Sequence, residues 1–173
     1  LHKLSRALLF DIYATVENLP GSLPAREAVV KKALEYLGAL VADSGGRPEL
    51  SRDLASAYQR VGEIQGHPFF ANLGDTAGCL ASLRTALEMR ERLLAGDPGN
   101  VDLTRDRNTS LNGIGSVLAW TGDVSGGLAM LRRAQASRGR LAACLPDDRR
   151  LQRDLAASAL TISGRSSAFC VVL

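Results

Sequence analysis

Aromatic residues, cysteines and histidines are scarce in this chain, and each scarcity narrows the class of protein. Aromatic side chains make up 5% of the 173 residues, while 46% of the residues are hydrophobic. The core must therefore be built largely from Ala and Leu, which suits closely packed helices. Three cysteines, Cys79, Cys144 and Cys170, lie far apart in the sequence without metal-ligand spacing. We expect buried thiols in a reducing compartment rather than a zinc site or a disulfide framework, with no metal and no cofactor.

Long apolar runs are also missing. No segment approaches the roughly 18 to 20 apolar residues that a membrane span needs, so we expect no membrane association and a cytoplasmic location. The start of the chain has neither an initiator methionine nor a signal-peptide cleavage pattern. Both features are expected of a segment taken from a longer protein, which leaves room for a catalytic domain upstream.

Catalytic groups are equally sparse. The two histidines, His2 and His67, lie at non-repeating positions without a Ser, Cys or carboxylate at a suggestive spacing. Catalysis needs an acid, a base or a nucleophile held within mutual reach of each other. We therefore expect no catalytic residue and no enzymatic activity in this chain itself.

Positive charge is modest overall, at +3, but arginine is concentrated toward the C-terminus. The arginines of this region are Arg132, Arg133, Arg138, Arg140, Arg149, Arg150, Arg153 and Arg165. Two interpretations remain open: solvated faces with inter-helix salt links, or a patch for an acidic partner or nucleic acid. Because no aromatic platform is interleaved with these arginines, we do not expect a nucleic-acid partner.

What the sequence does contain is an internal repeat. Gly74–Pro98 aligns without a gap on Gly122–Pro146, and 13 of the 25 positions are identical. The motif Leu-x-Arg-Asp recurs outside these segments, at residues 50–53, 103–106 and 151–154. Its spacings are 53 and then 48 residues, so the first copy carries five extra residues, and they fall in its internal turn. A repeat of this period indicates stacked structural units.

Helical periodicity describes most of the chain. Apolar residues recur at the spacing of amphipathic helices, and turn sequences rich in Gly, Pro, Asn and Asp separate the periodic segments. We expect helices at about 1–17, 22–43, 51–65, 75–95, 104–120 and 123–143, with a seventh beginning near 151. The tail from 161 to 173 leaves the pattern. The expected fold class is all-α, built from antiparallel helix pairs.

The repeated positions resemble those of the tetratricopeptide (TPR) repeat. Its packing and turn positions are occupied in the second copy by Leu111, Ile114, Gly115, Leu118, Gly122, Asp123, Leu131 and Ala134. The same positions in the first copy hold Tyr58, Val61, Gly62, Gly74, Asp75, Leu83 and Ala86. A Gly four residues after a bulky residue is expected to let the two helices of a pair approach closely. The second helices are about two turns longer than usual, as in the kinesin-light-chain-like variants.

This resemblance implies a short right-handed α-solenoid with four parts. Residues 1–49 would form a diverged N-terminal helix pair, 50–102 a repeat with an inserted turn, 103–150 a second repeat, and 151–173 an incomplete repeat with a tail. The unpartnered helix near 151 would expose Leu155, Ala159 and Ile162, and could self-associate through them. The ending Cys170-Val171-Val172-Leu173 matches a lipidation pattern, but we favour a chance apolar ending.

In TPR proteins the first helix of each pair lines a concave groove. The polar residues at groove-facing spacing in this chain are Ser56, Gln59, Glu63, Thr109, Asn112 and Ser116. We expect these side chains to point away from the apolar positions and to contact a protein or peptide ligand, with simple solvated polarity as the alternative. The inserted turn carries His67, Phe69 and Phe70, and these two phenylalanines must either tuck back into the core or form a contact loop.

A narrower resemblance concerns residues 9–22 and the turn at 66–75. Both are similar to the TPR region that follows the kinase domain in large bacterial, notably acidobacterial, serine/threonine protein kinases. The resemblance implies a non-catalytic scaffold or sensor module in the C-terminal region of a larger signalling protein. The alternative is a fragment of such a kinase whose catalytic domain lies upstream, because this chain has no Gly-rich phosphate loop, no His-Arg-Asp and no Asp-Phe-Gly.

Overall fold

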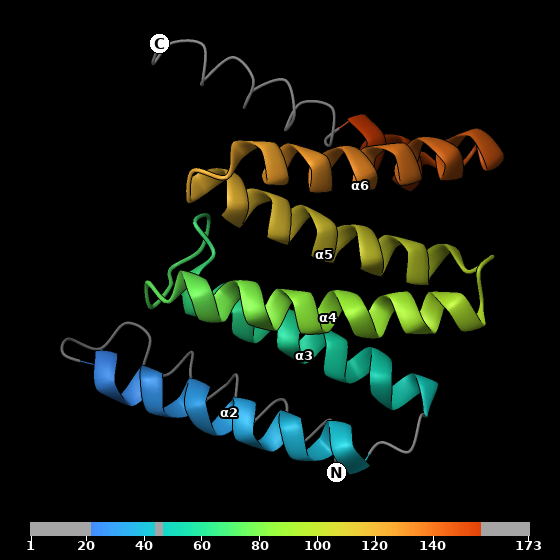
Figure 1. The fold of residues 1–173 in the computed structure, drawn as a ribbon. Helices are drawn as coiled ribbons and strands as arrows, with labels where there is room; N and C mark the ends of the chain where they lie inside the picture. Colours follow the sequence, from blue (N-terminus) through green and yellow to red (C-terminus); the bar gives the residue numbers. More distant parts are fainter. Residues whose placement is uncertain (1–21, 44–46, 157–173) are drawn as a thin grey trace, which may run out of the picture. The chain divides into compact units, whose positions relative to one another are not determined.

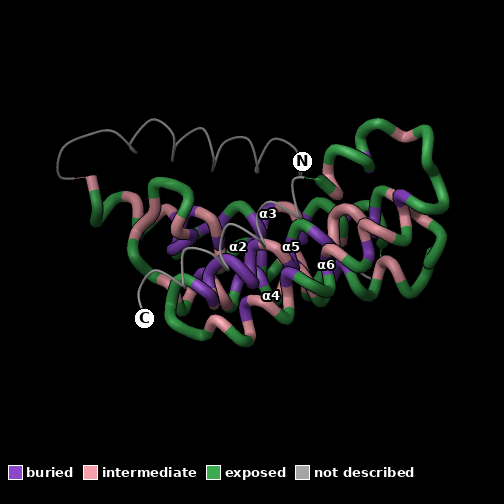
Figure 2. The backbone as a smooth tube through the Cα atoms, turned by 90° about the horizontal axis from the view of Figure 1, so that it is seen from above, coloured by how far each residue is buried: buried purple, intermediate pink, exposed green. Residues whose placement is uncertain are grey.

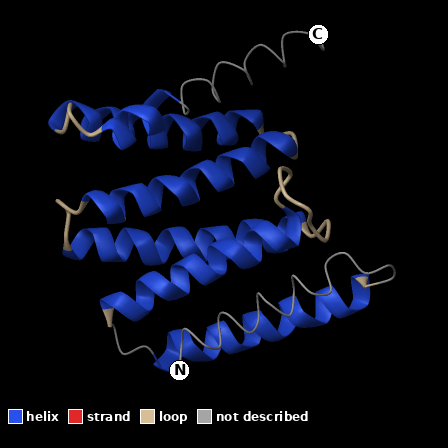
Figure 3. Cartoon of the chain, turned by 180° about the vertical axis from the view of Figure 1, so that it is seen from behind, coloured by secondary structure: helices blue, strands red, loops and turns tan. Residues whose placement is uncertain are grey.

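The computed structural model describes residues 22–43 and 47–156. These residues form helices joined by turns, without a strand (Figure 3), so the all-α prediction is confirmed for them. The helices are α2 (Leu23–Asp43), α3 (Pro48–Gly66), α4 (Thr76–Gly96), α5 (Val101–Trp120) and α6 (Val124–Cys144). Residues 149–156 are helical up to the end of the described range. The helix expected at 1–17, the tail at 161–173 and the Cys170 ending lie outside the described residues.

Helix starts differ from the predicted ones by a few residues where local capping decides them. Helix α3 begins at Pro48 rather than near 51, because a proline fits the first helical turn, where its missing N–H is not needed. Helix α5 begins at Val101 rather than near 104. Its start is set by Asn100, whose side-chain oxygen accepts a hydrogen bond from the backbone N–H of Leu103 at 3.0 Å.

The chain divides into two compact units, Leu1–Leu93 and Leu94–Leu173. In the first unit α2 packs against α3, and α3 and α4 lie side by side as an antiparallel hairpin (Figure 1). Its core is apolar and includes Val30, Ala33, Leu37, Leu54, Val61 and Ile64. In the second unit α5 and α6 form another antiparallel hairpin, and Arg105 of α5 pairs with Asp154 at 2.7 Å.

Both hairpins are held together by the same small-residue contact. A Cβ atom built on Gly115 of α5 would lie 2.9 Å from the backbone oxygen of Gly127 in α6. At the equivalent position of the first hairpin, a Cβ atom on Gly62 would lie 3.2 Å from the backbone oxygen of Cys79. The close approach of the two helices that the glycine spacing predicted is therefore present in both hairpins.

The turns of the two hairpins end alike and differ in length. Gly74 and Gly122 have φ angles of 80° and 97°, a left-handed conformation that favours glycine. The aspartate that follows each glycine caps the next helix: Asp75 accepts from Gly78 N–H at 2.8 Å and Asp123 from Gly126 N–H at 2.9 Å. The five extra residues of the first copy lie between the end of α3 and Gly74, in the loop 67–75.

Candidate functional site

A hydrogen bond between an arginine and an amide links the two helices in each hairpin. Arg90 of α4 donates to Oε1 of Gln59 in α3 at 3.1 Å, and Arg138 of α6 donates to Oδ1 of Asn112 in α5 at 3.3 Å. These four residues occupy equivalent repeat positions, because Gln59 aligns with Asn112 and Arg90 with Arg138. Two of the predicted groove residues therefore contribute to the packing of their own hairpins.

The six predicted groove residues do not form one open polar surface. Gln59 and Ser116 are buried, with exposed fractions of 7% and 6%, which corrects the expectation that they face solvent. Thr109 is exposed and Asn112 is half-buried. Ser56 and Glu63 are also half-buried, and the Ser56 hydroxyl donates to the carbonyl of Arg52 at 3.0 Å.

The burial of these polar residues follows from the number of neighbours around each helix. Helix α3 contacts α2 as well as α4, so it buries more than one stripe of side chains. Helix α5 contacts α6 and the residues near Asp154, and it likewise buries polar residues such as Asn108 and Ser110. Figure 2 shows buried positions along the helices and mostly exposed positions in the turns. A prediction from one amphipathic stripe cannot account for such helices.

The loop 67–75 has a defined shape, maintained by backbone and side-chain hydrogen bonds. Nδ2 of Asn72 donates to the carbonyls of His67 and Phe70 at 3.1 and 2.9 Å, and its Oδ1 accepts from Gly74 N–H at 2.8 Å. The loop is also tied to α3, since Leu73 N–H donates to the Ile64 carbonyl at 3.0 Å. Loop side chains are therefore presented in a fixed arrangement.

The two phenylalanines of this loop face solvent. Phe69 is 61% exposed and Phe70 is 47% exposed, so they do not tuck into the core, which was one of the two alternatives. His67 is the buried member of the group, and its ring centroid lies 5.6 Å from that of Phe69 and 5.0 Å from that of Phe70. The imidazole thus packs against two aromatic rings that are largely exposed at the surface.

A polar network around the buried side chain of Gln65 joins α3 to the end of the loop and to α4. Gln65 donates through Nε2 to the Asp75 carboxylate at 3.2 Å and accepts through Oε1 from the Ser82 hydroxyl at 2.6 Å. Cys79 lies nearby and is fully buried, whereas Cys144 is exposed, so the expectation of buried thiols holds for Cys79 and is wrong for Cys144. Burial raises the pKa of the Cys79 thiol from 9.0 to about 12, so Cys79 is held as an unreactive thiol.

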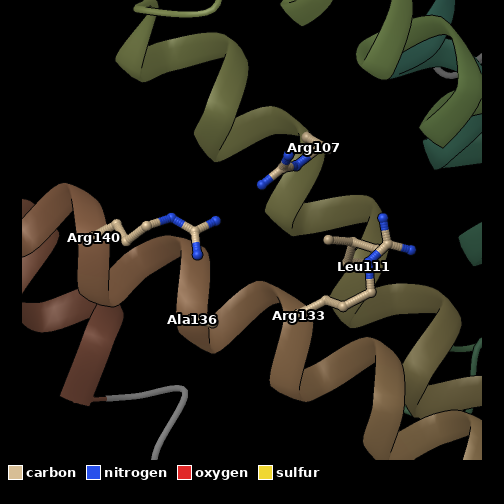
Figure 4. Close-up of a pocket in the computed structure, with 5 residues that line it drawn as sticks. All are labelled: Arg107, Leu111, Arg133, Ala136 and Arg140. Carbon is tan, nitrogen blue, oxygen red and sulfur yellow. The ribbon is translucent and has the colours of Figure 1, made fainter.

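The second hairpin carries a pocket of about 260 Å³ between α5 and α6. It is lined by Arg107 and Leu111 from α5 and by Arg133, Ala136 and Arg140 from α6. Figure 4 shows Arg107 and Arg140 extending toward one another across the space between the helices, with Arg133 beside Leu111. Nη2 of Arg107 donates to the buried hydroxyl of Ser137 at 2.7 Å, which fixes the guanidinium at the edge of the pocket.

Helix α6 is strongly positive, because it contains four arginines and no Asp or Glu. Burial lowers the pKa of Arg138, while the Asp154 carboxylate opposes the shift and Arg105 adds to it. The shifted residue is one that links the helices, and it does not line the pocket. Arg133 and Arg140 on the pocket side are exposed.

Two features of these surfaces escaped the sequence-based predictions. Arg133 and Arg140 were recognised only as members of a basic region, and Arg107 was not grouped with them. The available signal was the comparison of the two repeat copies, in which Leu54 aligns with Arg107. Trp120, at the end of α5, is 70% exposed, although the sequence offered no reason to single it out.

Neither a membrane helix nor a metal site is found in the part of the chain that the structure describes. None of the helices in residues 22–43 and 47–156 combines the length and apolarity that crossing a bilayer requires. The same residues hold no group of three His, Cys, Asp or Glu side chains arranged for a metal ion. No protein-family model, curated protein or solved structure shows significant similarity to this chain.

Proposed function

We propose that the chain is a non-catalytic protein-interaction module that binds a protein or peptide ligand through the loop 67–75. The observation that carries the proposal is the exposure of Phe69 and Phe70 on a loop held by hydrogen bonds. Exposed aromatic rings contribute much of the free energy of protein binding when a partner buries them. Because Asn72 and His67 already fix the loop, little conformational entropy is lost when a ligand binds.

The α5 groove residues are proposed as a second contact surface of the same kind. Thr109 is exposed and Asn112 is half-buried, so both can be reached by a ligand. Asn112 accepts a hydrogen bond from Arg138 at 3.3 Å, and a side-chain amide has capacity for further hydrogen bonds. This surface lies within the second unit and is proposed independently of the loop.

A narrower proposal assigns the module to a larger bacterial signalling protein. The resemblance of the repeat to TPR sequences, and of residues 9–22 and 66–75 to kinase-associated ones, supports this assignment. In that setting the module would recruit or sense a partner while a serine/threonine kinase domain, upstream of this chain, performs catalysis. Sequencing the reading frame upstream of Leu1 tests the proposal, and a frame without a kinase domain contradicts it.

The interaction proposal is tested by selecting binding peptides and then changing the loop. A phage-displayed library of random peptides is panned against the full chain, and the affinity of an enriched synthetic peptide is measured by calorimetry. Replacing Phe69 and Phe70 together by Ala should weaken binding by about 2–4 kcal/mol, as expected for buried aromatic anchors. The melting temperature should change little, because both rings are exposed.

A control variant separates the loop from apolar surface in general. Leu23, at the start of α2, is 49% exposed, and Leu23→Ala should leave the affinity unchanged. Equal affinities for the wild-type chain and the Phe69→Ala/Phe70→Ala variant would contradict the assignment of the site to the loop. If Thr109→Ala weakens binding instead, the site lies on α5.

A further inference from the structure

We propose that the pocket between α5 and α6 binds a phosphate monoester, presented by a phosphorylated side chain of a protein ligand. Three guanidinium groups, those of Arg107, Arg133 and Arg140, line one pocket of about 260 Å³. None of its five lining residues is acidic. Guanidinium groups of like charge around a common space favour an anion within it.

The first hairpin shows how the same framework looks without such a pocket. At the positions equivalent to Arg140 and Ala136 it has Arg92 and Glu88, which form an ion pair along α4. In the second hairpin Ala136 stands at the position of Glu88. Arg140 therefore lacks the carboxylate that Arg92 has four residues before it. An external anion can take the place of that carboxylate.

Two further differences between the copies add positive charge at this point. The buried Leu54 of the first hairpin corresponds to Arg107, and Thr85 corresponds to Arg133. Three of the differences that increase positive charge, at Arg107, Arg133 and Ala136, thus fall among the five residues that line the pocket, while the glycine contact between the helices is kept. The two described hairpins therefore share the same helical framework. The set of three arginines that lines the pocket is found in the second hairpin and not in the first.

The chemistry of the lining favours phosphate over other anions. A phosphorylated side chain carries a charge of about −1.5 to −2 and three strong acceptor oxygens, and so can engage several arginine forks. A carboxylate has two oxygens and is satisfied by a single arginine. Leu111 and Ala136 provide apolar wall for the methylene group of a phosphorylated residue. No aromatic ring lines the pocket for base stacking, which disfavours single-stranded nucleic acid.

The assignment of the phosphate to a protein segment rests on the proposed function, whereas the oxyanion pocket itself does not. The pocket lies in the second unit and the loop 67–75 in the first. A titration with a short phosphorylated peptide therefore reports on the pocket alone. If the loop variants fail to change the affinity of a selected peptide, the pocket titration is unaffected by that failure.

The experiment is a calorimetric or NMR titration of the full chain at fixed ionic strength. The probes are a capped tripeptide with a central phosphoserine, the same peptide with Ser or Glu at the centre, inorganic phosphate, and a single-stranded oligonucleotide. We expect saturable binding of the phosphopeptide and much weaker binding of its Ser and Glu counterparts. Arg140→Gln should weaken phosphopeptide binding by about 10-fold or more, as expected for loss of a charge-assisted bond.

The sharpest variant restores the first hairpin's arrangement. Ala136→Glu places a carboxylate four residues before Arg140, as Glu88 is placed before Arg92, and should abolish binding of the phosphopeptide. Ala136 and Arg140 are both exposed, so the Ala136→Glu and Arg140→Gln variants should keep the fold. The charge-matched controls are Ala39→Glu on α2 and Arg132→Gln on α6, both at exposed positions outside the pocket lining. Each should change the affinity by no more than about 2-fold, the size of a screened long-range effect.

Each remaining outcome decides against part of the proposal. Absence of saturable phosphopeptide binding, unchanged binding by Ala136→Glu, or equal weakening by Arg132→Gln and Arg140→Gln would overturn the pocket. Equal affinity for the Glu peptide would overturn its preference for phosphate. If inorganic phosphate binds as tightly as the phosphopeptide, the pocket stands and the protein source is overturned. Tighter binding of the oligonucleotide would assign the pocket to nucleic acid instead.

Discussion

At the scale of single residues, the repeat is defined by a few positions where size or charge decides the packing. Gly62 and Gly115 allow their helices to approach the backbone oxygens of Cys79 and Gly127. The sequence predicted this contact because a glycine at a fixed distance from bulky residues recurs in both copies. The sequence did not predict the pocket, because Arg107 faces Arg133 and Arg140 only after α5 and α6 have been placed side by side.

The tightest of these contacts leads to a prediction for Gly115→Ala. The added methyl group would lie 2.9 Å from the Gly127 oxygen and from Leu131 Cγ, so the two helices must separate. We expect a loss of about 1–2 kcal/mol in the free energy of unfolding, because overpacking outweighs the gain in helix propensity. Gly139→Ala is the matched control in α6. Space is open around Gly139, so it should stabilise the protein by about 0.5–1 kcal/mol. Denaturant unfolding that ranks the two variants in the opposite order would refute the packing.

The buried thiol of Cys79 leads to a prediction about pH. Burial raises its pKa from 9.0 to about 12 in the folded chain, so between these values the folded state binds more protons than the unfolded state. Its contribution to stability is therefore complete below pH 9.0 and is lost as the pH rises toward 12. The free energy of unfolding of the wild-type chain should fall more steeply above pH 9.0 than that of Cys79→Ala. Parallel pH profiles would show that the thiol is not shielded.

At the scale of helices, each hairpin is linked by an arginine of its second helix and an amide of its first. The sequence-based prediction placed Gln59 and Asn112 correctly on α3 and α5, but it expected both side chains to contact a ligand. Their engagement with Arg90 and Arg138 depends on the register of two helices, which a single amphipathic pattern does not contain. The helix boundaries were predictable to within a few residues, since Gly, Pro, Asn and Asp at the turns act locally.

Because of these links, we expect replacement of either amide to lower the free energy of unfolding of the chain even without a ligand. Gln59→Ala should destabilise the chain by about 1–3 kcal/mol, because it removes an acceptor from the buried Arg90. Asn112→Ala should cost less, about 0.5–1.5 kcal/mol, because Arg138 is only half-buried. Thr109→Ala, at an exposed position of α5, serves as the control and should change stability by less than about 0.5 kcal/mol. Equal unfolding midpoints for all three variants would show that the links contribute nothing.

At the scale of the whole molecule, the two copies of one hairpin carry different surfaces. The first copy has the five-residue insertion and exposes Phe69 and Phe70, and the second has the arginine pocket. The sequence identified the insertion and its phenylalanines but left their orientation open. Orientation is set by Asn72 and by the buried ring of His67, and such tertiary contacts cannot be derived from periodicity.

The most direct test of the interaction proposal is hydrogen exchange of the full chain with and without a peptide selected by display. If a ligand binds through the loop 67–75, the amides of these residues should exchange more slowly in its presence. Amides of α2 outside the core cluster against which Leu73 packs should exchange at unchanged rates. The same peptide added to the Phe69→Ala/Phe70→Ala variant should leave the loop amides unprotected. Saturating peptide that slows exchange elsewhere and leaves residues 67–75 unchanged would contradict the account.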